Sequence, residues 1–284
     1  MPTIWPRRIG TAPSATDLWG AQLFGLRSRR RRRLRELPVD ETRRRLLEDR
    51  VPYYRLLPPA GRRELEGLVQ VILDEKYFEG CAGFTVDEAV RTTIAGNASV
   101  LLLGRETDYY PLLSSILVYP SSFVAPIQMH HHDGCVSEDE EVRAGESWSA
   151  GSIVLSWEDV ERDLCGDEAG YNVVIHEFAH QLDDECSDGE GLPKLPCREM
   201  VAEWSRVFAS EYEELSRLVE GRREPLLGAY AAESPAEFFA VSTETFFTLP
   251  LDMQREHAAL YRLLAELYRQ DPAALCRSRG VAFV

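Results

Sequence analysis

Two histidines and a glutamate form the most specific motif in the sequence. His176 and His180 are four positions apart, and Glu177 directly follows the first of them. Residues four apart in an α-helix lie on the same face, one turn from each other, so both imidazoles can reach one metal ion. Glu177 lies beside that ligand axis, where a carboxylate can act as general base on metal-bound water. The motif therefore predicts a zinc hydrolase site.

The residues around this motif favour a buried helix over a surface helix carrying two ordinary histidines. Apolar side chains cover almost all of the remaining positions from 173 to 182, and a helix that is apolar nearly all round is normally buried. Buried histidines and a buried glutamate need polar partners. The composition of the chain gives only about 0.02 chance matches to this motif.

A third ligand is expected, because catalytic zinc usually takes three protein ligands and keeps one open position. Glu237 is the candidate, in the first turn of a helix that Ser234 and Pro235 begin. Its carboxylate can instead close a capping box with Ser234. The apolar residues that follow Glu237 suggest that this turn enters the core, which favours the ligand interpretation.

Other potential metal ligands have less suitable spacing. Cys186 and Cys197 follow the histidine helix, but they lack the spacing of a zinc ribbon. Three adjacent histidines, His130–His132, cannot all face one ion from a helix or a strand. We therefore expect no second metal site at either place.

Longer segments resemble a known family. From about residue 50 to 272 the sequence resembles the Mlc titration factor A family of zinc-dependent metallopeptidases, and its core is more distantly similar to the protease domain of anthrax lethal factor. The resemblance implies an α+β, zincin-like fold, mainly helical, with a small sheet beside the histidine helix. It rests on segments 78–80, 94–98, 118–124, 151–157, 176–183, 230–237 and 244–247.

The resemblance also implies roles for single residues. His176, His180 and Glu237 would hold one Zn²⁺, Glu177 would be the base, and Tyr230 would help to stabilise the oxyanion. The family's characterised member acts as an aminopeptidase and also binds the transcriptional repressor Mlc. The implied function is therefore a zinc metallopeptidase, with a peptide substrate, and the alternative is a protein-binding regulator of a repressor.

Further carboxylates can support the site. Ligating imidazoles usually donate their other N–H to a carboxylate or a carbonyl. Glu244 lies two turns beyond Glu237 and Asp183 lies three residues beyond His180, so both are candidates, with Glu244 preferred. An aminopeptidase also needs a carboxylate for the α-amine of its substrate, and Glu233 or Glu244 can serve.

Composition sets the broad class of the protein. The 284 residues carry a formal net charge of −15, yet half of the 32 basic residues lie within the first 63 positions. The arginine-rich run Arg27–Arg35 has no interleaved aromatic residues, and the acidic remainder disfavours a nucleic-acid partner. No apolar run is long enough to span a membrane and no secretory signal is evident, so we expect a cytoplasmic protein with reduced cysteines.

The chain is expected to contain one domain preceded by an arm. Residues 1–35 are predicted to form a poorly ordered basic arm, and residues 36–284 a single metallopeptidase domain. This domain is divided into a helical front at 36–110, a catalytic half at 111–272 and a short tail at 273–284. Strands are predicted at 116–119 and 152–157, with a mobile loop at 126–151 between them and helices over most of the rest.

Overall fold

The computed structural model describes residues 15–121, 123–130, 136–143, 145–148, 151–166, 170–187, 190–195 and 197–280. Within these ranges, only the backbone is described for residues 15–24, 123–148 and 187. In the described part of the chain, no helix is long and apolar enough to cross a membrane.

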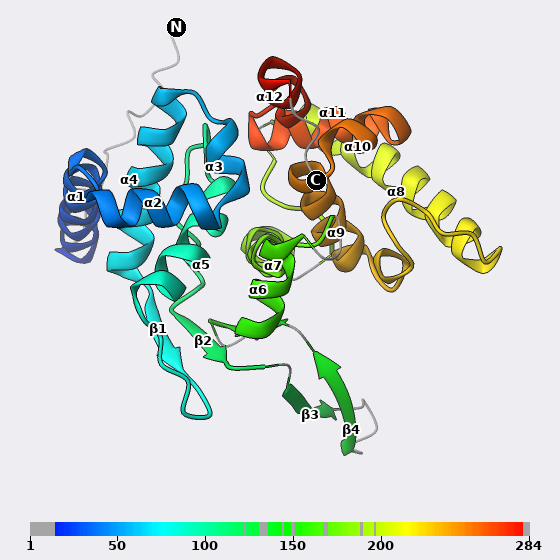
Figure 1. The fold of residues 1–284 in the computed structure, drawn as a ribbon, viewed down its shortest axis with the longest axis horizontal. Helices are drawn as coiled ribbons and strands as arrows, with labels where there is room; N and C mark the ends of the chain where they lie inside the picture. Colours follow the sequence, from blue (N-terminus) through cyan, green and yellow to red (C-terminus); the bar gives the residue numbers. More distant parts are fainter. Residues whose placement is uncertain are drawn as a thin grey trace, which may run out of the picture.

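The architecture is α+β and mostly helical (Figure 1). The histidine helix α7 lies between an N-terminal group of helices and a C-terminal group, and it contacts α5 on one side and α9 on the other. The helices are α1 (Ala15–Glu36), α2 (Glu41–Arg50), α3 (Pro52–Leu56), α4 (Pro59–Glu75), α5 (Glu88–Val100), α6 (Trp157–Cys165), α7 (Val173–Ser187), α8 (Arg198–Glu220), the 3-10 helix η1 (Tyr230–Ala232), α9 (Pro235–Thr248), α10 (Pro250–Glu256), α11 (Ala258–Tyr268) and α12 (Pro272–Arg279).

A small sheet lies beside α7 and contacts it through β5 and β6. Its strand order is β1-β2-β6-β5, with β1, β2 and β6 parallel and β5 antiparallel to β6. The two strands expected from the sequence are β2 (Ser115–Tyr119) and β6 (Ser152–Ser156), while β1 (Tyr77–Gly80) and β5 (Gly145–Trp148) are additional. In β2, the buried residues Ile116 and Val118 alternate with half-buried ones, whereas Ile153, Val154 and Leu155 of β6 are all buried.

The expectation of a loop over residues 126–151 was wrong. Strands β3 (Phe123–His130) and β4 (Val136–Arg143) pair as an antiparallel hairpin, and β5 follows. The hairpin projects below the sheet in Figure 1. His131 and His132 lie outside the described residues. The acidic run over β4 gives little of the apolar alternation that identifies a half-buried strand, which is why the sequence suggested a loop.

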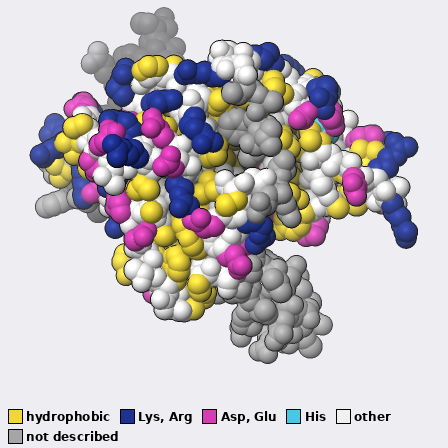
Figure 2. All heavy atoms as spheres, viewed as in Figure 1, with side chains coloured by type: hydrophobic (Ala, Val, Ile, Leu, Met, Phe, Trp, Pro, Cys, Tyr) yellow, Lys and Arg dark blue, Asp and Glu magenta, His cyan; other side chains and the backbone are white. Residues whose placement is uncertain are grey.

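The expected basic arm, residues 1–35, lies partly outside the described residues, which begin at residue 15. Residues 15–36 form helix α1, which packs against α4. Arg31 makes a two-pronged ion pair with Glu75, at 2.7 Å from Nε and 2.8 Å from Nη2, and also binds Asp108. Arg27 and Arg30 pair with Glu75 and Asp74. In Figure 2, basic and acidic side chains are interspersed over this end of the molecule. The arginine run is thus docked on the acidic body of the same chain.

Arg31 should hold α1 in place more strongly than its neighbour Arg30. The Arg31 side chain is only 10% exposed and both of its carboxylate partners remain if it is removed, whereas Arg30 is 66% exposed. We expect Arg31→Ala to lower the free energy of unfolding by about 3 kcal/mol, and Arg30→Ala to change it far less. Denaturant unfolding of both variants measures this.

The pH dependence of the same variant provides a further check. Burial favours protonation of Glu75, but Arg31 and Arg27 outweigh this effect and lower the pKa of the carboxyl from 4.5 to about 2. A lowered pKa stabilises the fold above the unfolded value and loses its effect as the pH falls through the folded value. The difference between wild type and Arg31→Ala should therefore shrink between pH 4.5 and 2. A difference that stays constant over this range would contradict the assigned pairing.

Candidate metal centre

The first turn of α7 is held in place by side chains from three other segments. Asn172 is the N-terminal cap, since its Oδ1 accepts from the Ile175 amide at 3.0 Å. Asp163, near the end of α6, accepts from the Val173 amide at 2.7 Å. The Asn172 side chain in turn donates to Asn97 of α5 at 3.1 Å. These bonds satisfy two of the free amides of the helix start, and they fix where the following turn places its side chains.

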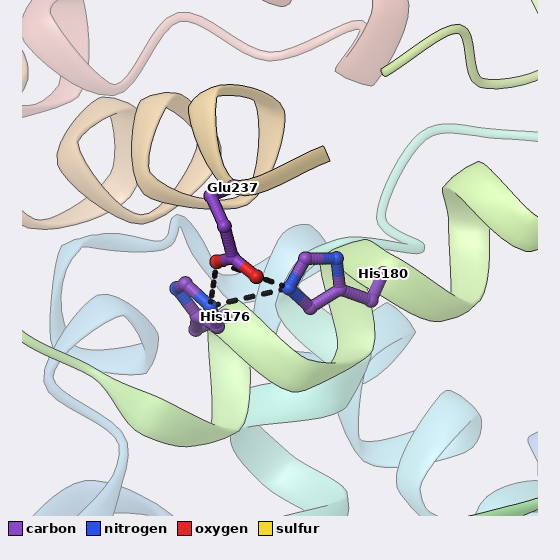
Figure 3. A group of neighbouring side chains, drawn as sticks. All are labelled: His176, His180 and Glu237. Atoms are coloured by element: carbon purple, nitrogen blue, oxygen red, sulfur yellow. Dashed lines mark hydrogen bonds and ion pairs between the residues drawn. The ribbon is translucent and has the colours of Figure 1, made fainter. Parts of the chain in front are cut away.

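Two histidines from α7 and a glutamate from α9 meet at one point (Figure 3). His176 Nε2 lies 3.1 Å from Glu237 Oε2 and 3.2 Å from His180 Nε2, and His180 Nε2 lies 3.5 Å from the same carboxylate oxygen. In the described part of the chain, this is the one group of three or more potential ligand side chains whose ligand atoms lie within 4.8 Å of one another. Such a set suits a single cation.

The helix that carries Glu237 begins as the sequence indicates. Ser234 is the N-terminal cap of α9, and its hydroxyl accepts from the Glu237 amide at 3.1 Å. The Glu237 carboxylate extends to the histidines across the gap between α9 and α7. The cap and the contact with the histidines therefore coexist, because the cap uses the backbone of residue 237 and the histidine contact uses its side chain.

Glu244 connects the histidine site to the start of α7. Its Oε2 lies 3.5 Å from His176 Nδ1, and its Oε1 accepts from the Asn172 amide. Glu244 is 5% exposed, on the same face of α9 as Glu237. When Nδ1 carries the proton and faces this carboxylate, the His176 Nε2 lone pair is directed toward His180 and Glu237.

Removal of the Glu244 charge should weaken the metal site without removing a ligand. We expect Glu244→Gln to reduce metal affinity by about 10–100-fold, because the amide aligns the His176 ring less strongly. Equilibrium competition with a chromophoric chelator measures the affinity. Asp252→Asn, on the partly exposed surface of α10, is a matched loss of one carboxylate charge and should leave it unchanged. An affinity equal to wild type in Glu244→Gln would contradict the contact.

The charges of the cluster are strongly coupled. Burial disfavours a charged His176, but Glu237 and Glu244 outweigh burial and raise the pKa of the imidazole to about 10. Burial likewise favours a protonated Glu237, yet the two histidines hold the pKa of its carboxyl well below the usual range. The protein alone thus keeps a positive charge among these carboxylates. A metal cation can replace that charge and displace a proton, so its binding should weaken as the pH falls.

Glu177 and Tyr230 lie beside this set. Glu177 is 4% exposed and directly follows the first histidine on α7. Tyr230, in η1, is 51% exposed, and its ring centroid is 6.0 Å from that of His176. Partial burial, followed by the charges of Glu237, Glu233 and Glu177, raises the pKa of its hydroxyl well above the usual range. The phenol therefore stays protonated and can donate a hydrogen bond at neutral pH.

Asp183 lies further along α7, where it organises the loop after the helix. It is fully buried and accepts from the Gly191 amide at 2.7 Å. Gly191 has φ +73°, and a Cβ there would lie 2.6 Å from the Pro235 carbonyl oxygen, so a glycine is required. The hydrogen bond ties this loop to α7, and Gly191 lets the loop pass close to Pro235 at the start of α9. A further role of Asp183 at His180 stays a prediction.

The cysteines that the structure describes do not join the cluster. Cys186 and Cys197 are free thiols with exposed side chains, and neither belongs to the described group of potential ligands. Cys81 and Cys165 are free thiols as well.

Two supporting residues were missed by sequence reasoning. Asn172 offered a signal, since an asparagine directly before an apolar helix is a common cap. Asp163 offered none, because it lies on a different helix and its role depends on how α6 packs against α7.

Comparison with known proteins identifies the family. The model of the glucose-regulated metallo-peptidase M90 family matches residues 26–269. This chain belongs to that family. It is 32% identical over 225 residues to Mlc titration factor A of Serratia proteamaculans, covering 77% of this chain and 85% of that protein. Mlc titration factor A of Escherichia coli (strain K12 / DH10B) is also 32% identical over 225 residues, covering 78% and 84%.

A relative without an assigned role is more similar. The uncharacterised protein slr2042 of Synechocystis sp. is 40% identical over 249 residues, covering 87% of this chain and 90% of that protein. The resemblance to the Mlc titration factor A family is thereby confirmed over most of the chain. Membership of a metallopeptidase family implies a metal ion, and the histidine–glutamate cluster is the described site that fits one.

Proposed function

We propose that this protein is a zinc-dependent peptidase with aminopeptidase-like action. The observation that supports the proposal best is the convergence of His176, His180 and Glu237 on one point. Glu177 directly follows the first of these histidines. Two imidazoles and one carboxylate on two packed helices are the gluzincin ligand set, and a zincin-like fold goes with it. One Zn²⁺ per chain is expected.

The distances within the cluster suit zinc. Zinc bonds to nitrogen and oxygen are about 2.0–2.1 Å long, so two corners of a tetrahedral site lie about 3.3 Å apart. The three distances among the ligand atoms are 3.1, 3.2 and 3.5 Å. Three protein ligands leave a fourth corner for water, as catalytic zinc sites require.

Each residue of this site can take a separate role in peptide hydrolysis. Bound zinc would act as a Lewis acid that polarises the peptide carbonyl, and it would lower the pKa of its water to about 7. Glu177 accepts the proton of the attacking water and passes it to the leaving amine. The Tyr230 hydroxyl donates a hydrogen bond to the oxyanion that develops on the carbonyl. Glu244 keeps the His176 ring oriented throughout.

The carboxylate that holds a substrate α-amine is best assigned to Glu233. Glu244 is buried and already contacts His176 and the Asn172 amide, so it is not available to a substrate. Glu233 is exposed, and it is close enough to Tyr230 to raise the pKa of that hydroxyl. The Glu233 carboxylate can therefore bind the α-ammonium group of a substrate beside Tyr230.

Metal removal tests the proposed function. Purified protein should hydrolyse short peptides with a free N-terminus, lose this activity on treatment with a chelator, and regain it with one equivalent of Zn²⁺. Peptides with an acetylated N-terminus should be cleaved far more slowly. Mass spectrometry of a peptide library reports both results. Activity that survives complete removal of metal would exclude the proposal.

A second function is suggested by the names of two relatives. Both are called Mlc titration factor A, which points to binding of a regulator protein. A protein-binding regulator of a transcriptional repressor, with a secondary zinc site, is therefore the alternative. If the protein co-purifies with a repressor partner but never hydrolyses peptides above a chelated control, this alternative is the better account. A cytoplasmic location stays a prediction.

A further inference from the structure

Helix α8 carries a row of aromatic side chains that supports the start of α9. Trp204, Phe208 and Tyr212 are four positions apart, so they lie along one face of α8. Phe208 and Tyr212 both meet the Phe238 ring edge to face, at 4.6 and 5.6 Å between ring centroids. Phe238 is fully buried and directly follows Glu237. The aromatic row therefore packs against the turn of α9 that presents this carboxylate to the histidines.

Each end of the aromatic row donates a hydrogen bond to a different segment. Trp204 Nε1 donates to the Gly191 carbonyl oxygen at 3.0 Å, in the loop after α7. The Tyr212 hydroxyl donates to the Ala232 carbonyl oxygen, also at 3.0 Å. Ala232 is the last residue of η1, two positions after Tyr230. The Tyr212 bond thus ties α8 to the short segment that carries Tyr230.

Local bonds alone do not place η1 over the metal centre. It has three residues, and no side chain caps its start. Its own backbone bonds are local, from the Ala232 amide to the Ala229 oxygen and from the Glu233 amide to the Tyr230 oxygen. Such 3-10 turns have poorer hydrogen-bond geometry than an α-helix. Tyr230 is also 51% exposed, so burial does not fix its ring. Contacts between η1 and its neighbours must therefore determine where the Tyr230 hydroxyl lies.

We propose that Tyr212 is a positioning residue for peptide hydrolysis, an inference that rests on the proposed function. Its ring contacts Phe238, next to Glu237, and its hydroxyl binds Ala232, so this one side chain connects the two segments that complete the site. The connection sets the position of η1 relative to α9, and it holds the Tyr230 hydroxyl where the oxyanion develops. A misplacement of about 1 Å can lower the rate of an enzyme by about 100-fold.

The hydrogen bond from Tyr212 also stabilises the fold, and this simpler role must be separated from positioning. If Tyr212 only stabilises the fold, loss of its hydroxyl slows the enzyme by the same factor whether or not Tyr230 has a hydroxyl. If Tyr212 acts through Tyr230, its loss matters much less once the Tyr230 hydroxyl is gone. A double-mutant cycle on the two tyrosines distinguishes these roles.

The test uses Tyr212→Phe, which removes the hydroxyl and keeps the ring against Phe238. We expect kcat of the zinc-loaded full-length protein, on a peptide with a free N-terminus, to fall about tenfold, with zinc affinity unchanged. In a Tyr230→Phe background, the same substitution should lower kcat by less than about twofold. Tyr77→Phe, which removes the hydroxyl of a tyrosine on β1 that is 63% exposed, should leave kcat at the wild-type value.

Amide hydrogen exchange provides a readout that does not require activity. Residues 229–233 should exchange faster in Tyr212→Phe, while the amides of α9 keep their wild-type protection. The proposal is overturned if Tyr212→Phe retains wild-type kcat or wild-type exchange at 229–233, or if it loses zinc affinity. It is also overturned if Tyr230→Phe is fully active, or if Tyr212→Phe slows both backgrounds equally. A wild type that hydrolyses no peptide is a different result, which refutes the proposed function and with it this catalytic role.

Discussion

Replacement of Glu177 by glutamine is expected to slow peptide hydrolysis by about 10²–10⁴-fold, the usual contribution of a general base. Glutamine keeps the size of the side chain but cannot accept the proton from water. The metal should stay bound, since His176, His180 and Glu237 are all intact. Turnover with a free N-terminal peptide and zinc content of the same preparation are the two measurements.

A matched control separates this effect from a general loss of charge. Glu213 is an exposed carboxylate on α8, and Glu213→Gln should hydrolyse peptide at the wild-type rate. If Glu177→Gln retains more than about a tenth of wild-type turnover, the assigned base is wrong. If it loses zinc together with activity, Glu177 instead supports the fold of the site.

Glu237→Gln should lower zinc affinity by more than about 100-fold, a larger loss than the 10–100-fold typical of residues that only orient a ligand. The neutral amide is a poor zinc ligand, and the site would keep two histidines. Competition with a chromophoric chelator at pH 7 measures the affinity.

Ser234→Ala is the paired variant for this comparison. It removes the hydroxyl that caps α9 and should cost about 1 kcal/mol of stability, while zinc affinity changes only slightly. Equal losses of zinc affinity in the two variants would indicate that Glu237 acts through the helix cap rather than as a ligand.

The central helices were predictable because local chemistry defines their ends. Ser234 and Pro235 identify the start of α9. The apolar residues around the two histidines indicate a buried helix, and α7 is buried. The two-turn spacing from Glu237 favours Glu244 over Asp183, and the Glu244 carboxylate lies 3.5 Å from the His176 ring.

Features that depend on residues far apart in the chain are harder to predict from the sequence. The arginine run resembles a solvated arm until Glu75 and Asp108 are brought beside it by α4 and the turn after α5. Strand β1 has only four residues, follows α4 after a single residue, and is defined by its pairing with β2. Helices α10 and α11 are separated at His257, where the backbone leaves the helical region at φ −124°. No local sequence pattern predicts these contacts.

The account depends on two imidazoles and one carboxylate sharing a single ion. X-ray absorption at the zinc edge of protein loaded with one equivalent of Zn²⁺ tests this directly. We expect a first shell of nitrogen and oxygen at about 2.0–2.1 Å, with the scattering pattern of two imidazoles and no sulfur. Sulfur neighbours at about 2.3 Å, or protein that takes up no zinc at all, would contradict the account.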